Sequence, residues 1–178
     1  MTTGQNYFLY SSDNDKKYHP YHWSGTQELN EALKNTADEY RKACPTAGKM
    51  EIGDMSLPWG GLYDFKLDWK NGHKEHRTGL NADIRKKTIR KSNRAKFIEI
   101  ACKKFNVGSE GDEKNEEPHY HFKVKTAAAT DEDVFSPDET DPKFIPCCTT
   151  PVPNACIILQ HNATDYAEYL PETPSDCK

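Results

Sequence analysis

The sequence has no long hydrophobic run, since none of its apolar stretches approaches the roughly 20 residues that a helix needs to cross a bilayer. It has no internal repeats. Its first residues, MTTGQNYFLY, lack the basic and apolar segments of a signal peptide, so we expect that any such segment was removed or never existed. With 178 residues, of which 29% are charged, we expect a soluble chain without a membrane span, folded as one domain or as one domain with an extension.

No nucleic-acid-binding motif is present, although one segment is strongly basic. The formal net charge of −4 conceals an uneven distribution, because residues 85–96, RKKTIRKSNRAK, are basic whereas residues 127–142 carry only acidic charges. A basic run this short is typical of a solvated helix face, and an anion-binding patch is the alternative. Aromatic residues are not interleaved with the basic ones, so we do not expect a nucleic-acid partner.

The paired C-x-x-C spacing of structural zinc sites is also missing. The even number of cysteines fits three disulfides in an oxidising compartment, although about 15 connectivities are open. Adjacent Cys147 and Cys148 are poorly placed to bond to each other. A second metal site made from Cys147, Cys148, Cys156 and His161 is the alternative. The six cysteines are Cys44, Cys102, Cys147, Cys148, Cys156 and Cys177.

Two segments have the periodicity of amphipathic helices. Residues 24–44 open with Ser24 three residues before Gln27, the spacing of a capping box, and Pro45 ends the helix. One face of this helix carries apolar residues three or four positions apart, namely Leu29, Leu33, Ala37, Tyr40 and Cys44. A second helix is predicted from Ser92 or Asn93 to Phe105, with Phe97, Ile98, Ala101, Cys102 and Phe105 on its apolar face.

Several short segments between and around these helices have the character of strands. They are residues 5–11, two runs within 50–69, residues 79–84, residues 119–125 and residues 155–160. The fold predicted from this order is α+β, with a small central antiparallel sheet flanked by helices. Residues 1–126 would form this domain. Residues 127–178, which are rich in Pro, Thr and Asp and hold four of the six cysteines, would form an irregular extension held by disulfides.

Histidines and a carboxylate gather in two of the predicted strands and the turn before one of them. His119 and His121 are two apart on a strand, so their side chains point to the same face. Gly79 allows the chain to turn sharply between His76 and Asp83. Pairing the two strands would bring His76, Asp83 and His121 together. Solvated histidines and a turn-capping Asp83 are the ordinary alternative, but the joint arrangement predicts a metal site.

The two segments also resemble a known superfamily. HRTGLNAD fits the pattern H-x-x-G-x-x-x-D, and PHYHFKV fits a later H-x-H. Together they resemble the peptidases that include D-alanyl-D-alanine peptidases, penicillin-insensitive murein endopeptidases and the Hedgehog signalling domain. The segment DMSLPWGGLYD is most similar to the murein endopeptidase branch, and the resemblance covers about residues 19–125.

The resemblance implies that His76, Asp83 and His121 bind Zn²⁺. It also implies active-site roles for His119, as general base or transition-state stabiliser, and for His73. The endopeptidase pattern has a further histidine where this chain has Glu116. The dipeptidase pattern has a Glu where this chain has Pro118. His119 is therefore the first candidate for the general base, followed by Glu116 or Glu117.

The function implied is an extracytoplasmic zinc metallopeptidase that hydrolyses amide bonds in peptidoglycan peptides. The alternatives are a non-catalytic zinc-containing binding module of the Hedgehog type and a disulfide-rich adhesion or toxin-like domain. Beyond this site, Tyr120 is predicted to lie in the core, and Trp59 either in the core or along the substrate cleft. His19 and His22 are predicted to lie in a loop without a metal.

Overall fold

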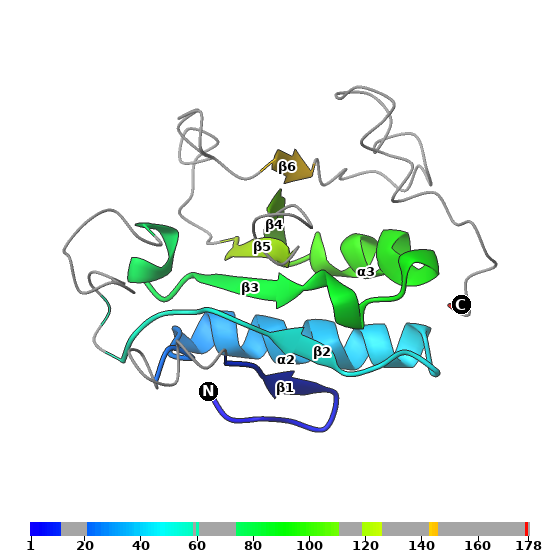
Figure 1. Ribbon diagram of the computed structural model, residues 1–178, viewed down its shortest axis with the longest axis horizontal. Helices are drawn as coiled ribbons and strands as arrows, with labels where there is room; N and C mark the ends of the chain where they lie inside the picture. The colour runs from blue at the N-terminus through cyan, green and yellow to red at the C-terminus, as the bar shows by residue number, and fades with distance from the viewer. Residues whose placement is uncertain are drawn as a thin grey trace.

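The computed structural model describes residues 1–11, 21–58, 60, 74–110, 119–125, 143–145 and 177 (Figure 1). These residues form an α+β structure with one sheet and two α-helices. The strands are β1 (Tyr7–Leu9), β2 (Met50–Ile52), β3 (Asn81–Arg85), β4 (Phe105–Glu110), β5 (His119–Val124) and β6 (Lys143–Ile145). The helices are α2 (Gln27–Ala43), α3 (Arg94–Ala101) and the 3₁₀-helices η1 (Lys74–Arg77), η2 (Lys86–Thr88) and η3 (Lys91–Asn93).

The sheet is mixed, with the strand order β1-β2-β3-β5-β4-β6. β1 runs parallel to β2, and the other neighbouring strands are antiparallel. The prediction of a small antiparallel sheet is therefore wrong. The reason is that helix α2 lies in the chain between β1 and β2, and a helical crossover of this kind returns the second strand in the direction of the first.

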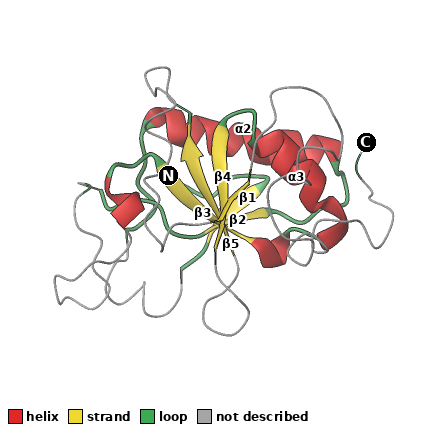
Figure 2. Cartoon of the chain, turned by 90° about the horizontal axis from the view of Figure 1, so that it is seen from above, coloured by secondary structure: helices red, strands yellow, loops and turns green. Residues whose placement is uncertain are grey.

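The two faces of the sheet differ in character. Both α-helices lie on one face (Figure 2), where the cross-strand pairs are apolar, namely Ala82 with Phe122 and Ile84 with Tyr120. Tyr120 is fully buried there, which confirms its predicted place in the core. The opposite face carries the polar pairs Asn81 with Lys123, Asp83 with His121 and Arg85 with His119. Strand alternation thus sends the apolar residues to the core and the candidate ligands to the other face.

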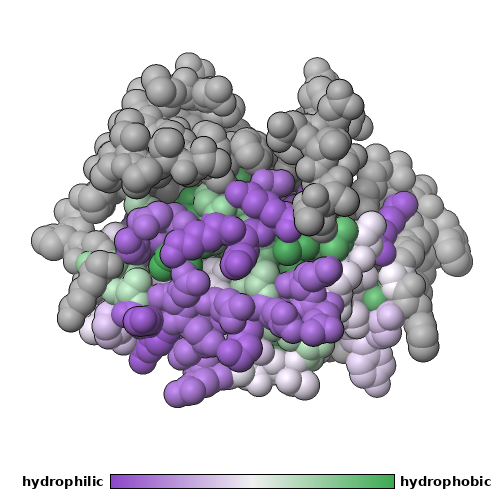
Figure 3. Space-filling view, turned by 180° about the vertical axis from the view of Figure 1, so that it is seen from behind, coloured by the Kyte–Doolittle hydropathy of each residue, from purple (hydrophilic) through white to green (hydrophobic). Residues whose placement is uncertain are grey.

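Helix α2 buries the apolar face that its sequence predicts, since Leu29, Leu33, Ala37, Tyr40 and Cys44 are all buried. Its N-cap, however, is Thr26, whose hydroxyl accepts a hydrogen bond from the Leu29 amide at 3.2 Å. The predicted cap Ser24 instead pairs with Ser56 in an isolated β-bridge. The exposed side of this helix is polar, and the described surface seen from behind is largely hydrophilic (Figure 3).

Helix α3 is shorter than predicted. It ends at Ala101, and Phe105, which was expected at the end of this helix, is the first residue of β4. Phe105 and Phe97 are both fully buried. A buried aromatic residue fits the apolar stripe of a helix and the inner face of a strand equally well, so periodicity alone did not separate the two.

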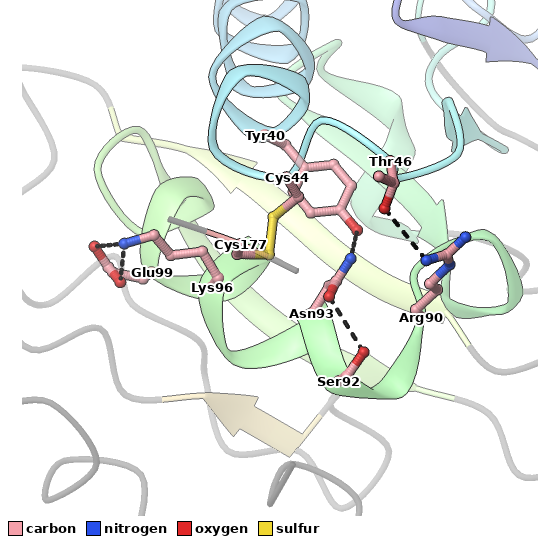
Figure 4. Close-up of a disulfide and its surroundings, with 9 residues drawn as sticks. All are labelled: Tyr40, Cys44, Thr46, Arg90, Ser92, Asn93, Lys96, Glu99 and Cys177. Atoms are coloured by element: carbon pink, nitrogen blue, oxygen red, sulfur yellow. Dashed lines mark hydrogen bonds and ion pairs between the residues drawn. A yellow bond between two sulfur atoms is a disulfide. The ribbon is translucent and has the colours of Figure 1, made fainter. Parts of the chain in front are cut away.

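Two pieces of the predicted C-terminal extension join the sheet domain. β6 pairs with β4, with Phe144 opposite Gly108, and Cys177 forms a disulfide with Cys44 at the end of α2 (Figure 4). Cys102 is disulfide-bonded as well. The other cysteines, Trp59, the second of the two strand-like runs predicted within 50–69, and residues 155–160 lie outside the described residues. The remaining pairings and the boundary at residue 126 therefore stay predictions. Among the described residues, no helix is long and apolar enough to span a membrane.

Replacing the true cap should destabilise α2. We expect Thr26→Ala to lower the free energy of unfolding by about 1 kcal/mol, because the Leu29 amide loses its acceptor. Ser24→Ala is the matched control and should have a smaller effect. Urea unfolding followed by circular dichroism measures both, and a larger loss in the Ser24 variant would show that the cap is assigned incorrectly.

The Cys44–Cys177 disulfide should contribute strongly to stability, because it joins residues 133 apart in the sequence. Cross-linking over such a distance restricts the unfolded chain and typically contributes about 2–5 kcal/mol. Cys177→Ala should therefore lower the midpoint of chemical unfolding under non-reducing conditions. A midpoint equal to that of the wild type would contradict this role.

Candidate metal centre

His76 is brought to the sheet by a short 3₁₀-helix held between two glycines. Gly79, with a φ of 72°, turns the chain from η1 into β3, and its carbonyl accepts a hydrogen bond from the Thr26 amide. Gly60 has a φ of 65°, and a Cβ at this position would lie 2.7 Å from the carbonyl oxygen of Arg77. Both positions need the left-handed backbone that glycine adopts without strain. These contacts fix the position of η1, and with it His76, just before β3.

Asp83 and His121 come together because they are direct partners across β3 and β5. His121 Nδ1 lies 3.0 Å from Asp83 Oδ1, and His76 Nε2 lies 3.3 Å from Asp83 Oδ2. The imidazole rings of His76 and His121 meet edge to face, with centroids 5.2 Å apart. One potential ligand atom from each of the three residues lies within 4.8 Å of the others. The structure thus brings together all three residues that the sequence predicted as ligands.

The three side chains are buried, with exposed fractions of 3% for His76, 9% for Asp83 and 2% for His121. Burial alone raises the pKa of Asp83. The attraction of His76 and the hydrogen bonds with His121 and His76 together outweigh this effect, so the pKa of the Asp83 carboxyl lies well below its usual range. Asp83 is therefore a carboxylate at neutral pH, which is the state that a metal ligand requires.

His119 lies beside this group on the same face of the sheet. Its Nε2 is 3.8 Å from Asp83 Oδ2, and its side chain is 16% exposed, more than that of any of the three ligand candidates. His119 thus lies next to the candidate ligands and is more accessible to solvent than they are. The other residues with predicted roles, His73, Glu116 and Glu117, lie outside the described residues, and their roles stay predictions.

A buried histidine has a partner that the sequence did not predict. His22 lies in a segment without regular secondary structure, as the loop prediction has it, while His19 lies outside the described residues. The His22 ring is fully buried, and its Nδ1 lies 2.6 Å from Asp54 Oδ1. The two residues are 32 positions apart in the sequence. No local pattern indicates such a pair, because it arises where the segment before α2 meets the end of β2.

The donor set fits a divalent transition metal. Two imidazoles and one carboxylate are the ligands that zinc takes in catalytic sites, where a fourth position is left for water or substrate. The residues come from adjacent, hydrogen-bonded strands and a helix anchored to them, which gives the rigid support that such sites need. The group could therefore hold a metal ion, although this donor set alone does not identify zinc.

Comparison with known protein families, with curated proteins and with solved structures finds no match to this chain. The resemblance to the zinc peptidase superfamily thus rests on the motif residues themselves.

Removal of one ligand should abolish metal binding. We expect the wild-type chain to bind about one Zn²⁺, and His121→Ala to weaken binding by at least ~100-fold, because only two protein donors remain. Lys123→Ala, two residues along the same strand and on the same face, is the matched control and should bind like the wild type. Isothermal titration of the metal-free proteins measures both. Equal affinities in the His121 variant and the control would exclude this centre.

Proposed function

We propose that this chain is a zinc-dependent peptidase that hydrolyses amide bonds in peptidoglycan peptides, in the manner of the murein endopeptidases. The observation that supports this most is the convergence of His76, Asp83 and His121, with His119 beside them. The motif resemblance supplies the substrate class. The disulfide between Cys44 and Cys177 supports an extracytoplasmic location, since such bonds persist in oxidising compartments.

The polar face of the sheet supplies the chemistry that amide hydrolysis needs. Zn²⁺, when bound, would act as a Lewis acid for the scissile carbonyl and the attacking water. His119 Nε2 would accept a proton from that water and return it to the leaving amine as the C–N bond breaks. The low pKa of the Asp83 carboxyl keeps this ligand candidate ionised during the reaction, so the proton taken from the water does not move to it.

The position of His119 favours it as the general base. It lies two residues before His121 on β5, and its Nε2 is 3.8 Å from Asp83 Oδ2. Its side chain is also more exposed than those of the ligand candidates. A base must lie near the metal and also meet the substrate, and His119 combines these two properties. His73 and Glu116 remain proposed as further active-site residues on the strength of the resemblance.

A non-catalytic zinc-containing binding module is the second candidate. The strong burial of the three ligand candidates favours it, as does the proximity of His119, which could serve as a fourth donor. Structural zinc sites have four protein ligands and no open position, whereas catalytic sites have three. The two functions therefore assign different roles to His119.

The His119→Ala variant separates these two functions. For a peptidase, it should keep most of its zinc affinity while cleavage of cross-linked muropeptides falls by roughly 10²-fold or more. Product masses from a defined peptidoglycan digest, with and without a chelator, measure the activity. Lys123→Ala again serves as the control and should cleave normally.

Two outcomes would contradict the peptidase. Zinc binding by the wild type without any chelator-sensitive cleavage would favour the binding module. A loss of zinc affinity in His119→Ala as large as that in His121→Ala would make His119 a ligand, and the centre would then have no open position.

A further inference from the structure

The chain beyond β2 is irregular at the point where it faces the candidate ligand Asp83. The Gly53 amide donates to the Asp83 carbonyl at 2.8 Å, while the Asp83 amide donates to the Asp54 carbonyl at 2.8 Å. In a regular antiparallel pair a single residue would make both bonds with Asp83. Here two consecutive residues share them, which is the two-to-one pattern of a β-bulge. Bulges occur next to active sites, where they redirect side chains.

A hydrogen-bonded side-chain pair, of which only the histidine is fully buried, holds Asp54, the second residue of this bulge. His22 is fully buried, and its Nδ1 lies 2.6 Å from Asp54 Oδ1, whereas 18% of the Asp54 side chain is exposed. The main chain reinforces the contact, because the Met55 amide donates to the His22 carbonyl at 2.9 Å and Ser24 pairs with Ser56. The segment that precedes α2 is therefore hydrogen-bonded to the residues of the bulge and to those that follow it.

The His22 ring is itself fixed from a second side. It packs against the ring of Trp23 with a centroid distance of 4.4 Å, and Trp23 Nε1 donates to the Tyr10 carbonyl at 3.1 Å, just after β1. A continuous series of contacts thus runs from the end of β1 through Trp23, His22 and Asp54 to the main chain of Asp83. Each step is a hydrogen bond or a ring contact within the described residues.

We propose that His22 and Asp54 are a positioning pair for the metal centre, an inference that rests on the proposed binding of Zn²⁺ by Asp83. The pair fixes the bulge. The bulge in turn fixes the Asp83 backbone, because Gly53 donates to the Asp83 carbonyl and Asp54 accepts from the Asp83 amide. Metal ligands must be held within about 0.5 Å of their productive positions. Outer residues that orient ligands typically contribute 10- to 100-fold to metal affinity.

Three substitutions test the pair. Asp54→Ala removes the acceptor, His22→Phe fills the buried space without ring nitrogens, and Asp54→Asn keeps an oxygen of the same shape. We expect Asp54→Ala and His22→Phe to weaken zinc binding by ~10- to 100-fold and Asp54→Asn to remain close to the wild type. Competition with a chromophoric chelator gives the affinity of each metal-free, folded protein for Zn²⁺.

A merely structural role must be distinguished from positioning. Ile98→Val, a buried substitution on α3 that costs about 1 kcal/mol, is the control and should lower the melting temperature without changing zinc affinity. The visible absorption of the Co²⁺-substituted proteins reports ligand geometry, and we expect it to change in Asp54→Ala and His22→Phe but not in Ile98→Val.

The outcomes separate this inference from the proposed function. A wild-type chain that binds no zinc overturns both. If the wild type binds zinc, and Asp54→Ala or His22→Phe is folded with unchanged zinc affinity and an unchanged cobalt spectrum, the positioning role is overturned while the metal centre stands. If Asp54→Ala does not fold, His22→Phe decides the matter by the same two measurements.

Discussion

The site depends on one cross-strand pair, Asp83 on β3 with His121 on β5. Direct partners on one face of an antiparallel pair have Cβ atoms only about 4.5–5.5 Å apart, so the strand register alone brings a carboxylate and an imidazole into contact. A shift of β3 by one residue would turn Asp83 to the helix-covered face, and the same shift of β5 would turn His121 there. The apolar residues that alternate with them, Ile84 and Phe122, prevent this shift because they must remain in the core.

The same alternation explains how a single sheet serves both stability and chemistry. The face under α2 and α3 is filled by Phe97, Tyr120 and Phe122. The ring centroid of Phe97 lies 5.9 Å from that of Tyr120 and 5.8 Å from that of Phe122. The other face carries a carboxylate whose pKa is held low by its histidine neighbours. Packing on the first face supplies the rigidity, and the second face can therefore hold polar groups that would be costly in a less ordered setting.

Much of this arrangement was predictable from the sequence, because periodicity marks the buried face of α2 and the H-x-H spacing places both histidines of β5 on one side. Three features were not. The parallel direction of β1 is invisible in its side-chain pattern, since alternation is the same in either direction. Ser24 and Thr26 are both good caps, and the choice between them depends on the bridge from Ser24 to Ser56. Asp54 gives no local sign that it meets His22, because their contact exists only in the folded chain.

The strand order has a further consequence for behaviour at high concentration. The described sheet is bounded by β1 and β6, each only three residues long. Short border strands present few unpaired amides and carbonyls to a second molecule, which limits intermolecular strand addition and the fibrils that can grow from it. The longer strands, including the pair that carries the candidate ligands, are enclosed between them and are thus shielded from such self-association.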